Sequence, residues 1–298
     1  MAPVAPQVAA KVLFERDGRI GRIFLNRPAV LNAIDDDVPR ALQAAVEQAQ
    51  ADPNVHVIVL AGKGDAFCAG YDLTYYAEAS GANAITQDMP WDPMRDYAFM
   101  MANTERFMSL FRAHIPVICK VHGYAVAGGS DIALCCDLIV MEDEARIGYM
   151  PARVWGCPTT AMWVYRLGPE KAKRMLFTGD KISGIEAQAM GLVHKAVPAA
   201  ALDAEVESLA ERIAGVPRNQ LMMQKLMINQ AMENMGLRTT QMIATVFDGI
   251  TRHSPEGLAF KRRAESVGWK QAVRERDLGT YDWTADAPMN SPQGKVER

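Results

Sequence analysis

Short runs of apolar residues alternate along the first two thirds of the chain with stretches in which apolar residues recur every three or four positions. The runs predict strands at residues 12–15, 19–25, 55–60, 115–121 and 138–141. The recurring pattern predicts a helix at 34–51, where one face carries Val38, Leu42, Ala45, Val46 and Ala49. Strands that alternate with helices indicate an α/β layer architecture, with ligands bound at the carboxyl ends of the strands.

The later part of the chain has a predominantly helical pattern. Helices are predicted at 161–167, 170–177, 203–214, 220–235, 237–250 and 255–264, and Ser183 with Glu186 has the spacing of a capping box. Residues 269–298 lose this periodicity and end polar, so we interpret them as a tail. We therefore divide the chain into a loose arm at 1–10, a core at 11–201, a helical region at 202–268 and the tail at 269–298.

Two glycine-rich turns follow predicted strands. The first runs through residues 61–73 and contains Gly70, and the second breaks at Gly123 and at Gly128-Gly129 before a helix. Glycine lets a backbone turn tightly and lets a ligand approach it, and a helix start offers N–H groups without partners. Asp131 lies in the first turn of that helix. The second turn could hold a negatively charged oxygen, or the glycines could simply turn the chain.

A long segment, residues 74–112, separates the two turns. Its middle, residues 83–91, is poorly periodic but carries aromatic and methionine side chains. An irregular stretch of this length is usually functional or disordered. Its composition favours a packed, lid-like segment over disorder.

Composition excludes several classes of protein. The formal net charge of −3 provides no basic field for nucleic acid. The five cysteines are odd in number and mostly surrounded by apolar residues, which favours reduced thiols in a cytoplasmic protein. Their spacing indicates no metal site. No apolar run is long enough for a membrane span, and the first residues lack the pattern of a signal peptide.

Three stretches resemble signatures of the enoyl-CoA hydratase/isomerase (crotonase) superfamily. The sequence LNRP at 25–28 with LNA at 31–33 is similar to the family's L-N-R-P…N-A-L, and FCAGYDL at 67–73 resembles F-C-A-G-A-D-L. The sequence GYAVAGGSD at 123–131 resembles G-x-A-x-G-G-G-x-E, and further matches at 178–180 and 187–193 follow T-G-…-A-x-x-x-G-L-V. The resemblance covers the chain from about Val8 to about Ala264.

This resemblance implies a spiral core of ββα turns with a C-terminal helical oligomerisation region that forms homotrimers or hexamers. It implies an acyl-CoA thioester as substrate, of the kind found in fatty-acid β-oxidation, and no other cofactor. By position, the backbone N–H groups of Tyr71 and Gly128 would form an oxyanion hole around the thioester carbonyl. Residues that could meet CoA or the substrate are Arg27, Lys63, Ala69, Asp72, Leu73 and, reaching from a neighbouring subunit, Lys261.

One feature of the family pattern is missing. Family hydratases use two carboxylates, and Asp131 occupies the first position as Asp in place of Glu. The second belongs to a loop of the form F-G-x-P-E-x-x-x-G. Here residues 147–156 carry Ala152 after the proline, and no carboxylate lies between Gly148 and Gly168.

Three interpretations of this gap remain open. Asp131 could act with a group from elsewhere, such as Tyr149 or the lid residues Asp88 and Asp92. The protein could catalyse isomerisation, thioester hydrolysis or decarboxylation, or it could bind acyl-CoA without turnover. Three other residues of this region are also considered. Arg153 could pair with Asp131 or hold a substrate carboxylate, and Trp155 could be an auxiliary side chain. Cys157 could be a nucleophile or a structural thiol. We favour an enoyl-CoA hydratase that adds water to a trans-2-enoyl-CoA.

Overall fold

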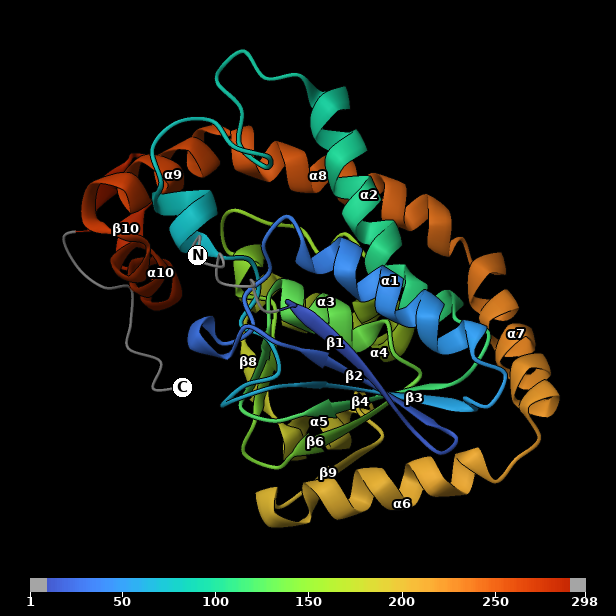
Figure 1. Ribbon diagram of the computed structural model, residues 1–298. Coiled ribbons are helices and arrows are strands. Elements are labelled where there is room, and N and C mark those ends of the chain that lie inside the picture. Colours follow the sequence, from blue (N-terminus) through green and yellow to red (C-terminus); the bar gives the residue numbers. More distant parts are fainter. Residues whose placement is uncertain (1–9, 290–298) are drawn as a thin grey trace, which may run out of the picture.

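The computed structural model describes residues 10–289, and five of the six strands of its largest sheet lie at the predicted apolar runs, the exception being β9 (Figure 1). The strand order is β1-β2-β3-β4-β6-β9; β1 is antiparallel to β2, and the other neighbouring pairs are parallel. The strands are β1 (Val12–Asp17), β2 (Ile20–Leu25), β3 (Val57–Gly62), β4 (Val117–Val121), β6 (Leu138–Glu142) and β9 (Lys195–Val197). This confirms the predicted α/β architecture.

A second, three-stranded sheet brings the two glycine-rich turns together. It consists of β5 (Tyr124–Val126), β7 (Arg146–Gly148) and β8 (Lys181–Ser183), in that order. The chain passes from β4 into β5 at Gly123, where φ is +58° and a side chain would clash with the carbonyl oxygen of Asp65. Only glycine fits this crossing. An isolated bridge between Cys68 and Ala125 then joins the first turn to β5.

The helices of the core cover one face of the large sheet. They are α1 (Val38–Ala51), α2 (Pro93–Arg112), α3 (Gly128–Leu134), α4 (Met162–Thr178) and α5 (Gly184–Met190), with short helical turns η1 (Pro28–Val30), η2 (Thr74–Glu78), η3 (Met150–Ala152) and η4 (Ala199–Ala201). Helix α1 begins four residues later than predicted. The break predicted at Gly168 is observed inside α4, and the capping box of Ser183 and Glu186 is formed.

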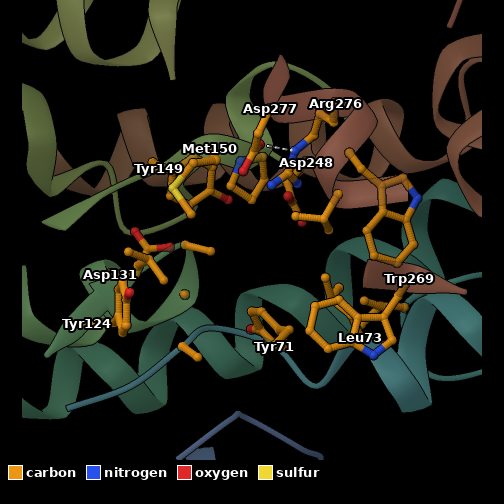
Figure 2. Close-up of a pocket in the computed structure, with 18 of the residues that line it drawn as sticks. Tyr71, Leu73, Tyr124, Asp131, Tyr149, Met150, Asp248, Trp269, Arg276 and Asp277 are labelled. Atoms are coloured by element: carbon orange, nitrogen blue, oxygen red, sulfur yellow. Dashed lines mark hydrogen bonds and ion pairs between the residues drawn. The ribbon is translucent and has the colours of Figure 1, made fainter. Parts of the chain in front are cut away.

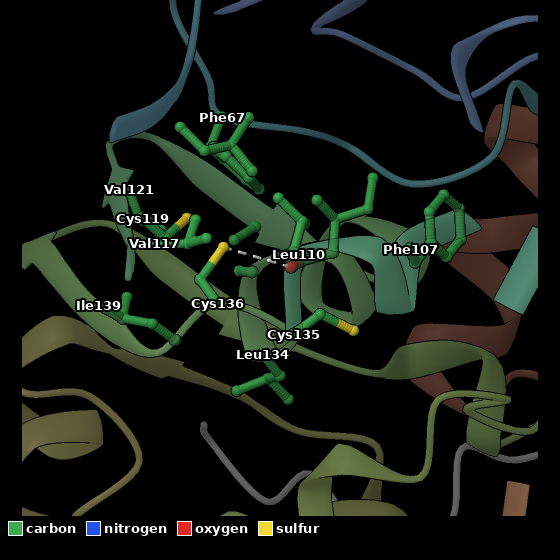
Figure 3. Packing of buried hydrophobic residues seen from close by; sticks show 14 of the residues in the cluster. Phe67, Phe107, Leu110, Val117, Cys119, Val121, Leu134, Cys135, Cys136 and Ile139 are labelled. Carbon is green, nitrogen blue, oxygen red and sulfur yellow. Dashed lines mark hydrogen bonds between the residues drawn. The ribbon is translucent and has the colours of Figure 1, made fainter. Parts of the chain in front are cut away.

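The hydrophobic core fixes α3 against the sheet (Figure 3). Leu134, Cys135 and Cys136, at the end of α3, pack with Cys119 of β4 and Ile139 of β6, and these five side chains are buried. All five cysteines of the chain are free thiols. On the opposite face of the sheet, α6 (Leu202–Ala214) covers a second apolar cluster (Figure 1). The core therefore holds the start of α3, and with it Gly128, in a fixed position.

The C-terminal region differs from the expected tail. Helices α7 (Arg218–Asn234), α8 (Leu237–His253) and α9 (Pro255–Val267) agree with prediction, but α10 (Trp269–Leu278) and a small hairpin of β10 (Tyr281–Asp282) and β11 (Ala287–Pro288) follow them. Helix α10 buries Ala272, Glu275 and Arg276. Because two of these three residues are charged, no apolar period marked the helix. The remainder of the predicted tail, 290–298, and of the arm, 1–9, lie outside the described residues.

Helix α8 has its apolar face outward. Its buried side includes Gln241, Thr245, Asp248 and Arg252. Together with α7 it exposes a set of large apolar residues, here called the α7–α8 apolar surface: Met223, Leu226, Met227, Ile228, Met242, Ile243, Val246, Phe247 and Ile250. Within residues 10–289, no helix has both the length and the apolar character needed to cross a membrane.

Candidate active site

A cavity of about 450 Å³ lies where the two glycine-rich turns meet helices α8 and α10 (Figure 2). Asp131 and Tyr124 border one side of it, and Leu73 and Trp269 border the opposite side. Tyr71 lies along a third side, across from Asp248 and Arg276. The cavity is therefore enclosed by segments that are far apart in the sequence.

The turns that carry Tyr71 and Gly128 are in contact. A methyl group on Gly70 would lie 3.4 Å from the backbone nitrogen of Gly128, and one on Gly128 would lie 3.0 Å from the ring of Tyr71. Ile34 pairs with the residues on both sides of Tyr71, accepting from the N–H of Asp72 and donating to Gly70 O. Successive N–H groups of extended backbone alternate in direction, so the N–H of Tyr71 points away from Ile34.

The second N–H comes from the first residue of α3. Ala127, just before it, has φ +51° and ψ −126°, a conformation that is unfavourable for a residue with a side chain. Its own N–H donates to Gly148 O at 2.9 Å, which holds the turn in place. Because Gly128 is the first residue of α3, no preceding helical turn accepts its N–H. Within residues 10–289, neither Tyr71 nor Gly128 donates its N–H outside regular helix and strand ladders, so both donors are available to a ligand.

Asp131 is buried beside these amides. Its side chain is 4% exposed, and Thr160 Oγ1 donates a hydrogen bond of 2.7 Å to its Oδ1. Burial raises the pKa of Asp131 to about 8; the hydrogen bond from Thr160 opposes this, and the charge of Asp248 adds to it. At neutral pH this carboxyl group is therefore mostly protonated.

A second carboxylate lines the same cavity and was missed by the sequence analysis. Asp248 comes from α8, far along the chain from the expected loop, and is 4% exposed. Its Oδ1 accepts the backbone N–H of Cys157 at 2.9 Å, and its Oδ2 accepts from Arg252 one turn later. Burial raises the pKa of Asp248, whereas Arg252 and the Cys157 N–H oppose the rise. Among residues 10–289, no cation pairs with Asp131, whereas Arg252 stabilises the charged form of Asp248.

Arg252 joins α8 to the lid-like segment. It also forms an ion pair of 2.6 Å with Asp96 of α2 and donates to Ile85 O at 2.7 Å. Trp91 stacks on His253 with ring centroids 4.3 Å apart. The segment is thus packed on α8, and Ile85 lines the cavity. Its action as a lid stays a prediction.

The sequence contains a pattern that could have indicated Asp248, but this pattern is ambiguous. Asp248 and Arg252 are four residues apart on a helix, which is ordinarily read as a solvated surface pair. The apolar residues of the same helix form the opposite face, which is exposed. From the sequence alone, the apolar face of α8 is expected to be buried and the ion pair to be exposed. The tertiary structure shows the opposite arrangement.

Several predicted site residues do line the cavity. Ala69 and Leu73 of the first turn are among its walls, as are Tyr149 and Trp155 of the incomplete loop. Tyr149 is buried, and the charges of Asp131 and Asp248 add to the effect of burial in raising the pKa of its phenol. Tyr149 is therefore a neutral group at physiological pH that borders both carboxyl groups.

Other predicted residues are engaged elsewhere. Arg153 does not pair with Asp131; it forms ion pairs with Asp180 at 3.4 Å and Asp277 at 3.3 Å. Arg27 pairs with Asp72 at 3.1 Å.

Two predicted CoA-binding lysines also have partners within the chain. Lys63 lies 3.6 Å from the ring centroid of Phe24. Lys261 donates to the carbonyl oxygens of Ala77 and Ala79 and pairs with Glu265. In this chain Lys261 anchors the end of η2. Contacts of these lysines with CoA stay predictions.

Three further residues considered for catalysis are not positioned or activated for it. Asp92 caps α2 by accepting from the N–H groups of Met94 and Arg95, and Asp88 is not among the residues that line the cavity. Burial raises the pKa of Cys157 to about 12, so its thiol is not an activated nucleophile. Among residues 10–289, no cluster of three or more His, Cys, Asp or Glu side chains is arranged to hold a metal ion.

Comparisons with known proteins agree over most of the chain. A family model described as enoyl-CoA hydratase/isomerase matches residues 15–271. A crystal structure of an enoyl-CoA hydratase from Mycobacterium smegmatis is 48% identical, has a TM-score of 0.85 and covers 93% of this chain and 97% of its own. A putative enoyl-CoA hydratase of Thermus thermophilus is 30% identical over 80% of this chain and 90% of the relative. A crotonyl-CoA hydratase of Syntrophomonas wolfei is 26% identical over 89% of this chain and 95% of the relative.

Proposed function

Because the chain belongs to the enoyl-CoA hydratase/isomerase family, we propose that it hydrates trans-2-enoyl-CoA thioesters. The observation that carries this proposal is the pair of buried carboxyl groups, Asp131 and Asp248, on one cavity with the N–H groups of Tyr71 and Gly128. Hydration requires a base, an acid and a site for the charge of an enolate. The cavity offers a group suited to each part.

The proposed reaction begins with water held by the Asp248 carboxylate. As the water oxygen bonds to the β-carbon, its proton passes to Asp248, and electron density shifts onto the thioester oxygen. The N–H groups of Tyr71 and Gly128 stabilise that oxygen. Protonated Asp131 then delivers its proton to the α-carbon, which yields the 3-hydroxyacyl-CoA. Transfer of the proton from Asp248, directly or through solvent, restores Asp131.

The protonation states support this division of roles. Asp131 has a pKa of about 8 and is a proton donor at neutral pH, whereas Asp248 has Arg252 as a counter-charge and is better suited to accept a proton. Two acids on one cavity with different electrostatic environments are a recurring arrangement for paired acid and base catalysis. Asp248 would take the place of the carboxylate that the loop at 147–156 lacks.

The alternatives within the family have less support. Thioester hydrolysis through a covalent intermediate would need an activated nucleophile, and the raised pKa of Cys157 argues against that residue. Isomerisation needs one group that moves a proton between two carbons, which Asp131 alone could supply. Hydration differs from isomerisation in that it also requires a group that activates water. The presence of a second carboxylate, Asp248, therefore favours hydration.

Steady-state kinetics with crotonyl-CoA test the proposal. We expect the wild type to hydrate it, and we expect Asp131→Asn and Asp248→Asn each to lower kcat by about 10²–10⁴, the range for loss of general acid–base catalysis. The double variant should be little worse than either single one, since the two groups act as a unit. Products of isomerisation and hydrolysis are measured in the same samples. Turnover to either of these without hydration, or binding without turnover, would refute the proposal.

We also propose that the α7–α8 apolar surface is a subunit interface of a homotrimer or of a hexamer made from two trimers. An exposed apolar patch of this extent is typical of a protein interaction site. Five free thiols, four of them buried, support a reducing compartment such as the cytoplasm.

A further inference from the structure

We propose that the acyl group of the substrate carries a second anionic group, a carboxylate, which the guanidinium of Arg276 binds at the end of the cavity bordered by α10. The inference rests on the proposed function, because it assumes that an acyl-CoA occupies this cavity. It concerns the substrate class of the site.

Arg276 is a buried cation with unused donors. It is 6% exposed and lines the cavity, and its Nε donates to Asp277 Oδ1 at 2.9 Å (Figure 2). Among residues 10–289, its two terminal nitrogens, Nη1 and Nη2, have no hydrogen-bond acceptor. A guanidinium carries five N–H donors in a fork that matches a carboxylate. A buried arginine that satisfies only its Nε leaves the two-pronged end of that fork for a ligand.

The neighbouring charges leave this arginine under-compensated. Asp277 is shared with Arg153 at 3.3 Å. Arg153 also pairs with Asp180, which in turn lies 4.0 Å from Arg174. Within residues 10–289, three guanidinium groups therefore share two carboxylates in this cluster. A buried charge without a full counter-charge is costly, and an anionic ligand group would remove that cost.

The orientation of Arg276 is fixed before a ligand arrives. Its guanidinium carbon lies 5.8 Å from the ring centroid of Phe260, a fully buried residue. Trp155 packs on the same ring from the incomplete loop, with centroids 5.2 Å apart. A donor group that is held by packing loses little entropy when it binds a ligand. Arg276 therefore has the features of a built anion site and not those of a mobile surface arginine.

The location of Arg276 favours the acyl group over the phosphates of CoA. Arg276 and Tyr149 line the same cavity as Asp131, the residue that we assign to the α-carbon. Arg276 is also buried, whereas highly charged phosphates favour solvent. The chemistry points to an enoyl-CoA that ends in a carboxylate.

The test compares two five-carbon trans-2-enoyl-CoA substrates, one with a terminal carboxylate and one with a terminal methyl group. We expect the wild type to prefer the carboxylate in kcat/KM. Arg276→Gln should lower kcat/KM for the carboxylate substrate by about 10- to 100-fold, as for loss of hydrogen bonds to a charged group, and leave the methyl substrate within about twofold. Arg276→Lys should retain part of the preference. Arg174→Gln is the matched control, because it belongs to the same charge cluster but does not line the cavity.

The outcomes separate this inference from the proposed function. Equal loss for both substrates in Arg276→Gln would assign Arg276 to CoA or to the fold and would overturn the inference. A wild type that prefers the methyl substrate would also overturn it, while hydration itself stands. If neither substrate is hydrated, calorimetric binding of the two corresponding saturated acyl-CoA thioesters still decides: a preference for the carboxylate that is lost in Arg276→Gln supports the site, and equal affinities refute it.

Discussion

Thr160 donates a hydrogen bond of 2.7 Å from its hydroxyl to Oδ1 of Asp131, and this bond orients the carboxyl group beside the two free backbone amides. Within the described part of the chain, Oδ2 of Asp131 has no side-chain partner, and Asp131 lines the cavity. Thr160 is itself fully buried, and its carbonyl accepts from Gln241 of α8 at 3.0 Å. The acid of the proposed reaction is therefore positioned by a residue that α8 holds.

Thr160→Val is expected to shift the pKa of Asp131 upward. The hydroxyl of Thr160 opposes the effect of burial, so its removal leaves a buried carboxyl group with one fewer donor to stabilise its charged form. The alkaline limb of the pH–rate profile should move to higher pH, and kcat should fall about tenfold because the carboxyl group loses its orientation. Thr160→Ser keeps the hydroxyl and should resemble the wild type. Identical profiles for the Val and Ser variants would contradict this role.

The pH dependence of the wild type follows from the raised pKa of Asp131. Its carboxyl group donates a proton only below a pH of about 8, so kcat should fall as pH rises through that value. An acid limb should appear where Asp248 becomes protonated, since a protonated carboxyl group cannot take a proton from water. Measurement of kcat for crotonyl-CoA between pH 5 and pH 10 checks both limbs. A rate that stays constant from pH 7 to pH 10 would contradict the assignment of Asp131 as the acid.

The same pKa affects stability. The folded-state pKa of about 8 lies above the ordinary value of 3.8, so between these values the native state binds a proton that the unfolded state has released. The contribution of Asp131 to the free energy of unfolding therefore decreases as pH rises from about 4 to about 8, by at most about 1.4 kcal/mol per pH unit. Asp131→Asn should reduce the slope of stability against pH in denaturant unfolding. An unchanged slope would count against a protonated, buried Asp131.

Arg252→Met is expected to be strongly destabilising. It leaves Asp96 and Asp248 buried without their shared cation, and breaking a buried ion pair in this way typically costs about 3–5 kcal/mol. Arg40→Gln provides the control, because Arg40 pairs with Asp37 at the surface and such pairs are worth about 1 kcal/mol or less. Denaturant unfolding of both variants measures the difference. A cost below about 1 kcal/mol for Arg252→Met would show that Asp248 does not depend on Arg252.

Much of the fold could be predicted because local patterns determine it. The runs at 55–60 and 115–121 are mostly apolar in the sequence, and the strands β3 and β4 that form there are largely buried. The capping box at Ser183 and the break at Gly168 depend on a few neighbouring residues. The contact between Tyr71 and Gly128 was reached only through the family resemblance, since no local pattern shows that two loops meet.

The predictions that failed depend on charge pairs and on contacts between separate segments of the chain. Helix α10 buries Glu275 and Arg276, because Arg263 pairs with Glu275 at 2.7 Å and Asp277 pairs with Arg276. Neither pairing can be read from a hydrophobic period. From the sequence, Arg153 was a possible partner of Asp131. In the structure it pairs with the carboxylates of Asp180 and Asp277 instead. The second carboxylate was sought in one loop, whereas the fold supplies it from α8.

Phe247→Glu is expected to weaken the oligomer. Phe247 is 52% exposed in the middle of the α7–α8 apolar surface, and a charge there would be desolvated in an interface. Phe177→Glu is the comparison, since Phe177 is 79% exposed on α4, outside that surface. Size-exclusion chromatography with light scattering gives the mass of each variant. Equal masses for Phe247→Glu and the wild type, at concentrations near the dissociation range, would place the interface elsewhere.

A crystal structure with bound 3-hydroxybutyryl-CoA, the product expected from crotonyl-CoA, is the most direct test of the account. We predict that the thioester oxygen lies about 2.7–3.1 Å from the backbone nitrogens of both Tyr71 and Gly128. Asp131 should face the α-carbon, and Asp248 should contact the 3-hydroxyl group. A thioester oxygen bound away from these two amides, or a hydroxyl group directed away from Asp248, would contradict the proposed site.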